Sequence, residues 1–342
     1  MAVNLRDVAH RAGVSVPTAS RVLSGSDYPV ATALRERVEQ AARDLDYVPN
    51  AQAQGLLGGA ARTVGVLVGT VDDPYFSEIV NGIHEVATDR QLLVTICSTE
   101  RDVDRELEYF RLLQAHRTGV VIIAGSGRTD DRYGTMMAAR ARSFEAAGGR
   151  VVAIGHPYFD VDHVLVDNAA GGRRLGEHLV ALGHRDVGVL VGVAEVSSTV
   201  ERVDGIRSAI EGAGGSVTLR QGAPTRDEGY AGAGALLTDR PGLTALVGTA
   251  DQMAIGAMSW LREHGRAVPE DVSVAGFNDI AVSRDLNPGL TSVRLPLRAM
   301  GAAALEIALA PAPSTQPVIR ELGTELIVRG STGPAPGTPA RG

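Results

Sequence analysis

Lysine is absent from the sequence, so every cationic contact must come from arginine or histidine. All 33 residues counted as lysine or arginine are therefore arginines, and 40 acidic residues outnumber them to give a net charge of −7. This balance argues against a protein whose entire surface binds nucleic acid. Residues 1–24 nevertheless hold three arginines and one acidic residue, which leaves that segment locally basic.

Cysteine and long apolar runs are also scarce. Cys97 is the only cysteine, so no disulfide can form within the chain, and its apolar surroundings in LLVTICST predict a small core residue. No apolar run approaches the roughly 20 residues that a membrane helix needs. The first residues lack the apolar segment and cleavage site of a secretory signal. We therefore expect a protein of the reducing cytoplasm that has no membrane partner.

The residues that are present divide into zones. Residues 1–46 read as wholly helical, residues 47–62 as a linker with one weak helix, and residues 63–331 as strands alternating with helices. Continuous apolar strands that alternate with helices predict buried parallel sheets, and two sets of such strands predict two lobes. Residues 332–342 are rich in proline and glycine and are predicted to be disordered.

The first zone has the pattern of two helices joined by a tight turn. Asn4 can cap a helix over LRDVAHRA, Gly13 suits a tight turn, and Ser15 can cap the next helix. Small and apolar side chains at helical spacing would pack the two helices together. This is the helix-turn-helix arrangement, in which the second helix leaves its polar face free to enter a major groove. The alternative is a helical hairpin with no DNA function.

The second helix carries side chains suited to DNA. The hydroxyls of Thr18 and Ser20 can bond phosphates or base edges, and Arg21 can bond a guanine through two hydrogen bonds, a contact worth roughly 1–3 kcal/mol of discrimination. Val16 and Pro17 can offer only apolar contact, for instance to a thymine methyl group. We predict that this helix reads the DNA sequence.

At this point the chain resembles a known family. The segments LRDVAHRAGVSVPTASRVLSG and VATALRERVEQAARDLDYVPNAQAQGLLGG, followed in order by DPYFSEIVNGI, VSVAGFNDI and LTSVRLPLRAMG, resemble the LacI/GalR family of bacterial transcription regulators. The resemblance implies an all-α helix-turn-helix headpiece, a hinge helix, and an α/β two-lobed core like that of periplasmic binding proteins, which usually dimerises. It places the lobes at about 63–165 with 293–321, and 166–292 with 322–331.

The resemblance also assigns a role to the linker. In the family, a short helix after YxPN forms on the operator, and a leucine enters the minor groove, where Leu56 stands here. A helix this short is unstable alone, and Gly55 weakens it further, so it would order only on DNA. The alternative is a passive flexible linker. The residues predicted to contact DNA are Val16, Pro17, Thr18, Ser20, Arg21, Asn50 and Leu56.

The family's core binds a small molecule between its lobes, beyond the carboxyl ends of strands. Arg202 corresponds to the family's ligand-binding arginine, although an interlobe salt bridge is the alternative. Tyr75 and Phe76 could instead pack at a helix start, and His156 could be a hydrogen-bonding loop residue. The predicted effector-binding residues are Asp73, Tyr75, Phe76, Ser126, His156, Ser198, Arg202 and Asn278.

Several positions depart from the family's sugar-binding pattern. Polar, acidic or aromatic residues expected there are replaced by Ala250, Asn278, Gly155, Leu295 and Pro224. The loss of acids that grip hydroxyls makes a simple hexose a less favoured effector. A less polar or an anionic ligand, or no ligand at all, becomes more favoured.

Enzyme chemistry finds no support in the sequence. There is no P-loop, GxSxG or HExxH motif, and His178 and His184 have no carboxylate or cysteine partner at a metal-binding spacing. We expect no cofactor and no metal. The prediction is a homodimeric, ligand-responsive repressor that binds a palindromic operator on double-stranded DNA, with a carbohydrate or anionic metabolite as the candidate effector. The rivals are a small-molecule sensor without DNA function and a DNA-binding regulator without a ligand.

Overall fold

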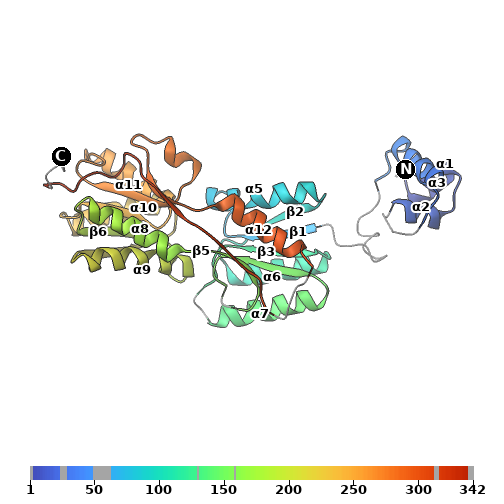
Figure 1. The fold of residues 1–342 in the computed structure, drawn as a ribbon, viewed down its shortest axis with the longest axis horizontal. Helices are drawn as coiled ribbons and strands as arrows, with labels where there is room; N and C mark the ends of the chain where they lie inside the picture. Colours follow the sequence, from blue (N-terminus) through green and yellow to red (C-terminus); the bar gives the residue numbers. More distant parts are fainter. Residues whose placement is uncertain are drawn as a thin grey trace.

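The computed structural model describes residues 3–23, 29–48, 63–128, 131–157, 159–311 and 316–337 (Figure 1). Helices α1 (Leu5–Ala12), α2 (Val16–Leu23) and α3 (Thr32–Asp44) form an N-terminal headpiece. Two α/β lobes follow, each built on a six-stranded sheet. The fold class predicted from the sequence is therefore confirmed.

The helix boundaries of the headpiece follow from local chemistry. The side chain of Asn4 accepts hydrogen bonds from the backbone of Arg6 and Asp7, and the Asp7 side chain accepts one in return from the Asn4 backbone, at 2.9 Å. This reciprocal arrangement stabilises the first turn of α1. Gly13 ends the helix at φ 64°, a conformation that glycine adopts without strain. The Ser15 hydroxyl accepts from the Thr18 amide at the start of α2.

The three helices enclose a small apolar core. Val8, Ala9, Ala19 and Val22 are buried, as predicted, and side chains of α3 complete the cluster. Tyr47, which the sequence placed in the linker, packs against this core, and its amide bonds the Ala42 carbonyl at 2.9 Å. The headpiece therefore extends at least one residue beyond the predicted boundary at 46.

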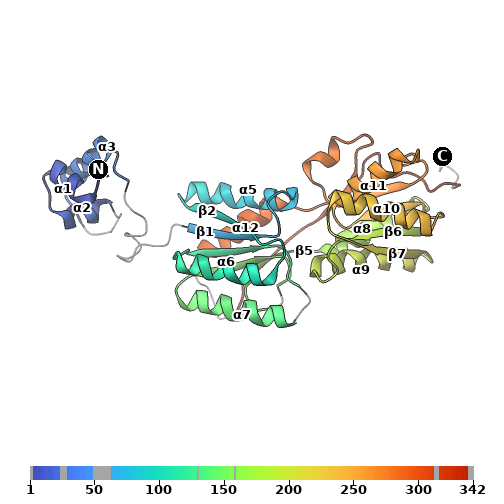
Figure 2. The ribbon, with the colours of Figure 1, turned by 180° about the vertical axis from the view of Figure 1, so that it is seen from behind.

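The first lobe is a parallel sheet in the order β11-β5-β4-β3-β1-β2. Helices α5 and α12 cover one face, and α6 and α7 cover the other (Figure 2). This double cover explains why strands such as VVIIA are apolar throughout. The elements are β1 (Thr63–Val68), α5 (Pro74–Asp89), β2 (Leu93–Ser98), α6 (Val103–Ala115), β3 (Val120–Ala124), α7 (Asp131–Ala146), β4 (Arg150–Ile154), β5 (Asp162–Val166), α12 (Leu297–Leu309) and β11 (Ile319–Leu322).

The second lobe repeats the plan in the order β12-β10-β9-β8-β6-β7, with only β12 antiparallel to its neighbour. Helices α8 and α9 pack on one face, and α10 and α11 pack on the other. The elements are α8 (Asn168–Ala181), β6 (Asp186–Val191), α9 (Ser197–Gly212), β7 (Ser216–Gln221), α10 (Arg226–Asp239), β8 (Ala245–Gly248), α11 (Asp251–Glu263), β9 (Ser273–Asn278), the short η1 (Ala281–Arg284), β10 (Thr291–Arg294) and β12 (Glu325–Ile327).

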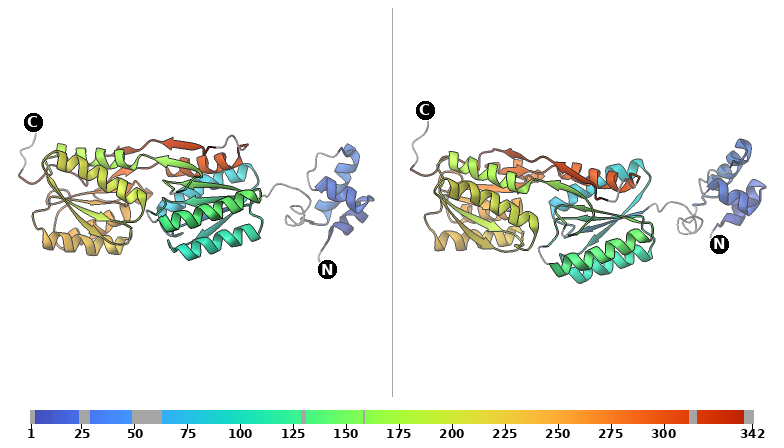
Figure 3. Two further views of the ribbon diagram at one scale, coloured as in Figure 1. Left: turned by 90° about the horizontal axis from the view of Figure 1, so that it is seen from below. Right: turned by 60° about the horizontal axis from the view of Figure 1, so that its bottom comes forward.

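The chain crosses between the lobes three times. It leaves the first sheet after β5, returns after β10, and crosses again between β11 and β12, which are neighbours in sequence but belong to different sheets (Figure 3). The expected boundaries at 165, 292 and 321 therefore fall one or two residues early. The strands extend past those points because their last residues still pair with a neighbouring strand.

The predicted disorder of the C-terminal tail is wrong for residues 332–337. The Ala335 amide donates to the Leu182 carbonyl at 2.8 Å, and the Gly333 carbonyl lies 3.0 Å from Nε2 of His184. Ala335 itself is buried. Backbone groups of the tail therefore form hydrogen bonds with the second lobe. Composition alone predicted that these groups would be exposed to water. Residues 338–342 lie outside the described residues.

Two further expectations can be compared with the fold. Cys97 is buried in β2, as predicted. Within the described ranges, none of the helices has the length and apolar character needed to cross a bilayer.

Gly82 tests how closely α5 and α12 must approach. A Cβ atom at this position would lie 1.9 Å from the Arg298 carbonyl oxygen. Gly82→Ala should therefore destabilise the protein by about 1–3 kcal/mol despite the better helix propensity of alanine. The midpoint of urea unfolding measures this change.

Gly212→Ala is the matched control, because a Cβ atom at this position of α9 would have no described heavy atom within 4 Å beyond its own stretch of helix. It should leave stability unchanged or raise it by about 0.4–1 kcal/mol. Equal midpoints for the two variants would contradict the close packing of α5 on α12.

Candidate functional site

One face of α2 remains open after the headpiece has packed. Ala19 and Val22 point into the core, whereas Val16, Pro17 and Arg21 are exposed. The remaining two predicted contacts on this helix, Thr18 and Ser20, are half-buried, and the Thr18 hydroxyl lies 2.8 Å from the Ser15 hydroxyl. The helix thus presents an apolar end and an arginine. Asn50 and Leu56, the other predicted DNA contacts, lie outside the described residues.

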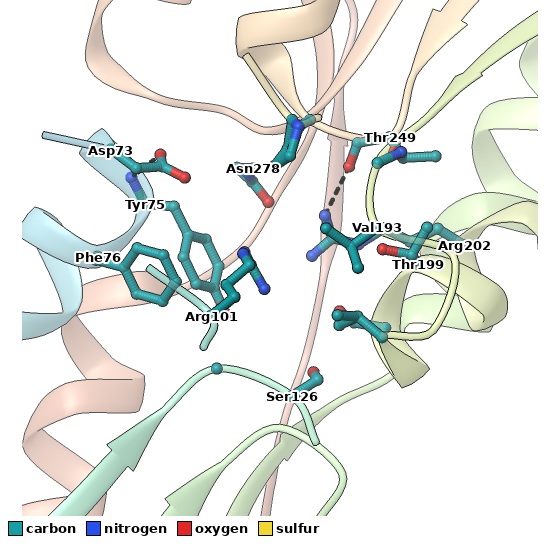
Figure 4. Close-up of a pocket in the computed structure, with 16 residues that line it drawn as sticks. Asp73, Tyr75, Phe76, Arg101, Ser126, Val193, Thr199, Arg202, Thr249 and Asn278 are labelled. Atoms are coloured by element: carbon teal, nitrogen blue, oxygen red, sulfur yellow. Dashed lines mark hydrogen bonds between the residues drawn. The ribbon is translucent and has the colours of Figure 1, made fainter. Parts of the chain in front are cut away.

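A cavity of about 500 Å³, part of it open to solvent, lies between the two lobes. Its walls come from the residues that follow β1, β2, β3, β6, β8 and β9, so it sits beyond the carboxyl ends of strands, as expected for such sheets. Figure 4 shows Arg101 and Arg202 extending into it from opposite lobes. Seven predicted effector residues line it: Asp73, Tyr75, Phe76, Ser126, Ser198, Arg202 and Asn278.

His156 is the predicted effector residue that does not line this cavity. Its exposed ring lies 3.6 Å from the Glu201 carboxylate, and its backbone carbonyl accepts hydrogen bonds from the Gly127 amide and the Ser197 hydroxyl. The geometry agrees with the alternative reading of His156 as a hydrogen-bonding loop residue. Its ring lies beside α9, the helix that carries Glu201.

Arg202 is the most deeply buried cation of the cavity. Its Nε donates to the Asn168 side chain at 2.9 Å, its Nη1 donates to the Thr249 carbonyl at 2.7 Å, and its guanidinium lies 4.2 Å from the centre of the Phe277 ring. Within the described residues it forms no ion pair, so the interlobe salt bridge considered above is not what holds it. Burial lowers its pKa to about 10, which leaves it charged at neutral pH.

Asp73 and the two aromatic residues after it form the wall on the first lobe. Asp73 caps α5 by accepting from the Tyr75 amide at 3.0 Å, and burial raises the pKa of its carboxyl. Phe76 is fully buried and meets the Tyr75 ring edge-on at 5.0 Å. Phe76 therefore packs in the core and also lines the cavity, so the two readings of this residue are compatible.

The opposite wall is fixed by a buried carboxylate beneath the loop after β9. Asp251 accepts from the Ile280 amide at 2.8 Å and from the hydroxyls of Ser283 and Ser292 at 3.1 and 2.6 Å. Asn278, two residues before Ile280, has a φ of 111°, and within the described ranges its buried Oδ1 has no hydrogen-bond partner. An acceptor left unpaired costs free energy, and a ligand that donates a hydrogen bond would recover it.

Arg101 is a cavity residue that sequence reasoning missed. It follows β2, and its guanidinium lies 5.6 Å from the centre of the Phe76 ring, within cation–π range. Burial lowers its pKa. The signal was present in the sequence, because the carboxyl end of the run LLVTICST belongs to the same sheet edge as the strand ends that were considered.

Packing explains two departures from the family's sugar-binding pattern. A Cβ at Gly155 would lie 2.4 Å from the Ser126 hydroxyl, so no acidic side chain fits there. Leu295 is buried in the core and lies outside the cavity lining. Pro224 and Ala250, in contrast, do line the cavity and make its second-lobe wall less polar.

The lobes touch beside the cavity through their backbones. Arg128 and Val196 form an antiparallel bridge, and the Ser197 amide donates to the Gly127 carbonyl at 3.1 Å. Since one partner of each pair comes from each lobe, this contact depends on the angle between the lobes.

The histidines considered for metal binding have other partners. His184 lies between the hydroxyls of Thr244 and Ser273, at 2.9 and 3.1 Å, and His178 lies 3.0 Å from the Thr332 hydroxyl. Among the residues that the structure describes, no group of three or more histidine, cysteine or acidic side chains is placed to hold a metal ion.

Comparison with known proteins agrees with this architecture. Residues 4–50 match the family "Bacterial regulatory proteins, lacI family", and residues 177–332 match a periplasmic binding protein-like domain. The regulator CelR of Thermobifida fusca is 33% identical over 96% of this chain and 97% of its own, and the regulator GalS of Salmonella typhimurium is 32% identical over 92% and 91%. A solved lac repressor dimer bound to operator and an anti-inducer matches with a TM-score of 0.81, at 27% identity over 97% of this chain and 100% of that one.

Asp251 generates a pH prediction. Burial raises its pKa to about 7 against the opposing effect of its hydrogen bonds. A carboxyl that holds its proton more tightly in the folded state contributes stability at low pH and loses it as the pH rises toward 7, by about 1.4 kcal/mol per pKa unit of difference. Asp251→Asn should therefore flatten the decline in unfolding free energy between about pH 5 and about pH 8.

Urea unfolding of both proteins at the two pH values measures this effect. The exposed Asp239, at the end of α10, provides the control variant Asp239→Asn, which should keep the wild-type pH dependence. Parallel pH curves for wild type and Asp251→Asn would contradict the assignment.

Proposed function

The chain belongs to the lacI family of bacterial regulatory proteins, and on this premise we propose that it represses transcription as a homodimer on a palindromic operator. A small molecule held between the lobes would change the operator affinity. Its curated relatives named above are transcriptional regulators, and the chain is likewise a regulator and not an enzyme.

The observation that carries the proposal is the division of surfaces on α2. The helix uses Ala19 and Val22 for packing, so its exposed face is not needed for stability. A turn of glycine and a capped second helix is the geometry that places such a face in a major groove. Arg21 would supply base recognition, and Leu56 would enter the minor groove at the centre of the site.

The cavity between the lobes supports a polar or anionic effector. Arg202 offers a planar fork suited to carboxylate, phosphate or vicinal hydroxyls. Asn278 adds an acceptor without a partner. A ligand that binds both lobes would favour one angle between them, and it shifts operator affinity only if it binds one of the two states better.

The edge strand β2 supports dimerisation through the first lobe. Strand β2 is the outermost strand of its sheet, and its apolar residues Leu93 and Ile96 are 66% and 46% exposed. Leu93 is also the register partner of Thr63, the first described residue after the linker. A dimer that covers this edge would bring the two linkers together, as paired hinges on one operator require. An uncovered apolar edge would be an aggregation hazard.

Arg21→Ala tests base recognition. Duplexes bound by the wild type are first selected from a random DNA pool at near-physiological salt, and the recovered site is then titrated by fluorescence anisotropy. We expect a palindrome, and we expect Arg21→Ala to relax the preference at one base pair of each half-site by about 1–3 kcal/mol.

Arg43→Ala is the matched control, because it removes the same charge from the exposed surface of α3. It should weaken binding to all sequences alike. If Arg21→Ala behaves in the same way and reduces the salt dependence by about one phosphate contact, Arg21 contacts the backbone and does not read a base.

Ile96→Asp tests the dimer. It should convert the protein to a monomer in light scattering after size exclusion, and lower operator affinity by about a hundredfold or more because the two headpieces are no longer linked. Ile319→Asp on β11, the opposite edge of the same sheet, is the control and should remain dimeric. A dimeric Ile96→Asp variant would overturn the placement of the interface.

A further inference from the structure

A second cavity, of about 450 Å³, adjoins the first and reaches into the first lobe. The two share a wall formed by Phe76, Arg101, Gly125, Ser126 and Val196. Beyond that wall the second cavity is lined by charged and polar side chains to which the proposed function assigns no role. These are Arg128, Glu106 and Tyr133, together with Thr99.

The second cavity has an excess of positive charge. Arg101 and Arg128 face a single carboxyl, that of Glu106. In the part of the chain that the structure describes, neither guanidinium has a carboxylate oxygen within the 4.0 Å of an ion pair. The Glu106 carboxylate instead accepts from the Tyr133 hydroxyl at 3.0 Å. The two half-buried cations are therefore held close to each other, and neither makes an ion-pair contact with a described carboxylate.

One donor in this cavity is buried and unsatisfied. Nε of Arg128 is inaccessible to solvent and, among the residues that the structure describes, has no hydrogen-bond partner. A buried donor without a partner costs about 1–3 kcal/mol, and more when it is charged. An acceptor that enters the cavity would remove this cost, which favours an anion over a neutral group.

The backbone directs Arg101 toward the same space. Glu100 and Arg101 have φ angles of 52° and 59°, which side-chain-bearing residues seldom adopt. The Arg101 amide is fixed by the Thr99 hydroxyl at 3.3 Å. Such strain persists where the surrounding structure enforces it, and it is concentrated at functional sites.

We propose that the second cavity binds an anionic group, a carboxylate or a phosphate, that forms part of the effector. This inference rests on the proposed function, since it assumes that the effector's uncharged polar part occupies the first cavity, next to Arg202 and Asn278. Arg101, in the shared wall, would contact both parts. The effector class is therefore an acidic or phosphorylated polyol and not a neutral sugar.

The site is also placed to act on the lobe angle. Arg128, which would bind the anion, forms the backbone bridge to Val196 in the second lobe. An anion that fixes Arg128 from the first lobe would thus stabilise the contact between the lobes. A neutral ligand confined to the first cavity would leave Arg128 unsatisfied.

Inorganic sulfate is the probe, because it carries the same charge at every pH of the experiment. The thermal unfolding temperature of the protein is followed against sulfate concentration, with chloride at equal ionic strength as reference. Wild type, Arg128→Gln and Arg101→Gln are compared with Arg105→Gln, which removes an exposed arginine of α6. The general stabilising effect of sulfate is common to all four proteins.

We expect saturable binding by wild type and Arg105→Gln, and affinities about tenfold or more weaker for Arg128→Gln and Arg101→Gln, since each loses a charge-assisted hydrogen bond. Identical sulfate curves for all four proteins would overturn the proposal. Circular dichroism without sulfate identifies a variant that fails to fold. If Arg128→Gln fails to fold, Arg128→Lys replaces it. Arg128→Lys keeps the charge and should retain part of the sulfate affinity.

Glu106 supplies a second readout. Burial raises its pKa to about 7, while Tyr133, Arg101 and Arg128 around it oppose that shift. Ionised Glu106 repels an anion, so sulfate affinity of the wild type should fall as the pH rises through about 7. Glu106→Gln should bind sulfate with an affinity that does not change over this range. The same pH dependence in both proteins would contradict the site.

Matched pairs identify the source of the anion. Displacement of sulfate by glucuronate but not by glucose would indicate a carboxylate, and displacement by glucose 6-phosphate alone would indicate a phosphate. Displacement by glucose as strongly as by its acids would overturn the assignment of an anionic group. Failure to select any DNA duplex, with sulfate binding intact, would count against the proposed function and not against this cavity.

Discussion

The burial of Arg202 with no carboxylate partner among the described residues is the constraint on which the interlobe region depends. Its guanidinium is held by the Asn168 side chain and the Thr249 carbonyl, which are neutral acceptors, and by the face of Phe277. Neutral acceptors compensate only part of the cost of burying a charge. The folded protein therefore keeps a cation at the interface of the lobes that an anionic or polar ligand can neutralise. Such a ligand could bind Arg202 without first displacing a described carboxylate from it.

One of the residues that hold Arg202 lies where the chain crosses between the lobes. Asn168 begins α8 directly after β5, where the chain first crosses, and Thr249 lies at the end of β8. The backbone bridge between Arg128 and Val196 closes the same cleft from the other side. A ligand that draws these groups together acts on the angle between two rigid sheets. The first sheet begins at Thr63, the first described residue after the linker, so its position fixes where the linker ends.

Local rules predicted the parts of the structure that are local. The cap at Asn4, the turn at Gly13 and the buried strand VVIIA depend on residues within a few positions of one another. The family resemblance supplied the lobe arrangement and seven of the residues that line the first cavity. Arg101 was missed because its role depends on β2 lying beside β1, which brings a distant strand end to the cavity edge.

Tertiary contacts explain the remaining differences. The tail was expected to be disordered, yet Gly333 and Ala335 find backbone partners on the second lobe that no composition analysis can locate. The ring of His156, an expected ligand contact, lies 3.6 Å from the carboxylate of Glu201, 45 positions further along the chain, which no local pattern indicates. The absence of an acid at Gly155 has a steric cause in the Ser126 hydroxyl, which only the folded structure places there.

On the proposed function, the contact between the lobes sets operator affinity. Replacing Arg128 and Val196 together by cysteine tests it most directly, because bridged antiparallel partners lie at a distance that a disulfide can span. The native Cys97 is buried. Operator affinity of this one variant is measured by anisotropy in its oxidised and reduced forms. We expect affinities that differ by about tenfold or more, in line with an allosteric coupling of about 1–3 kcal/mol. Equal affinities in the two forms would contradict it.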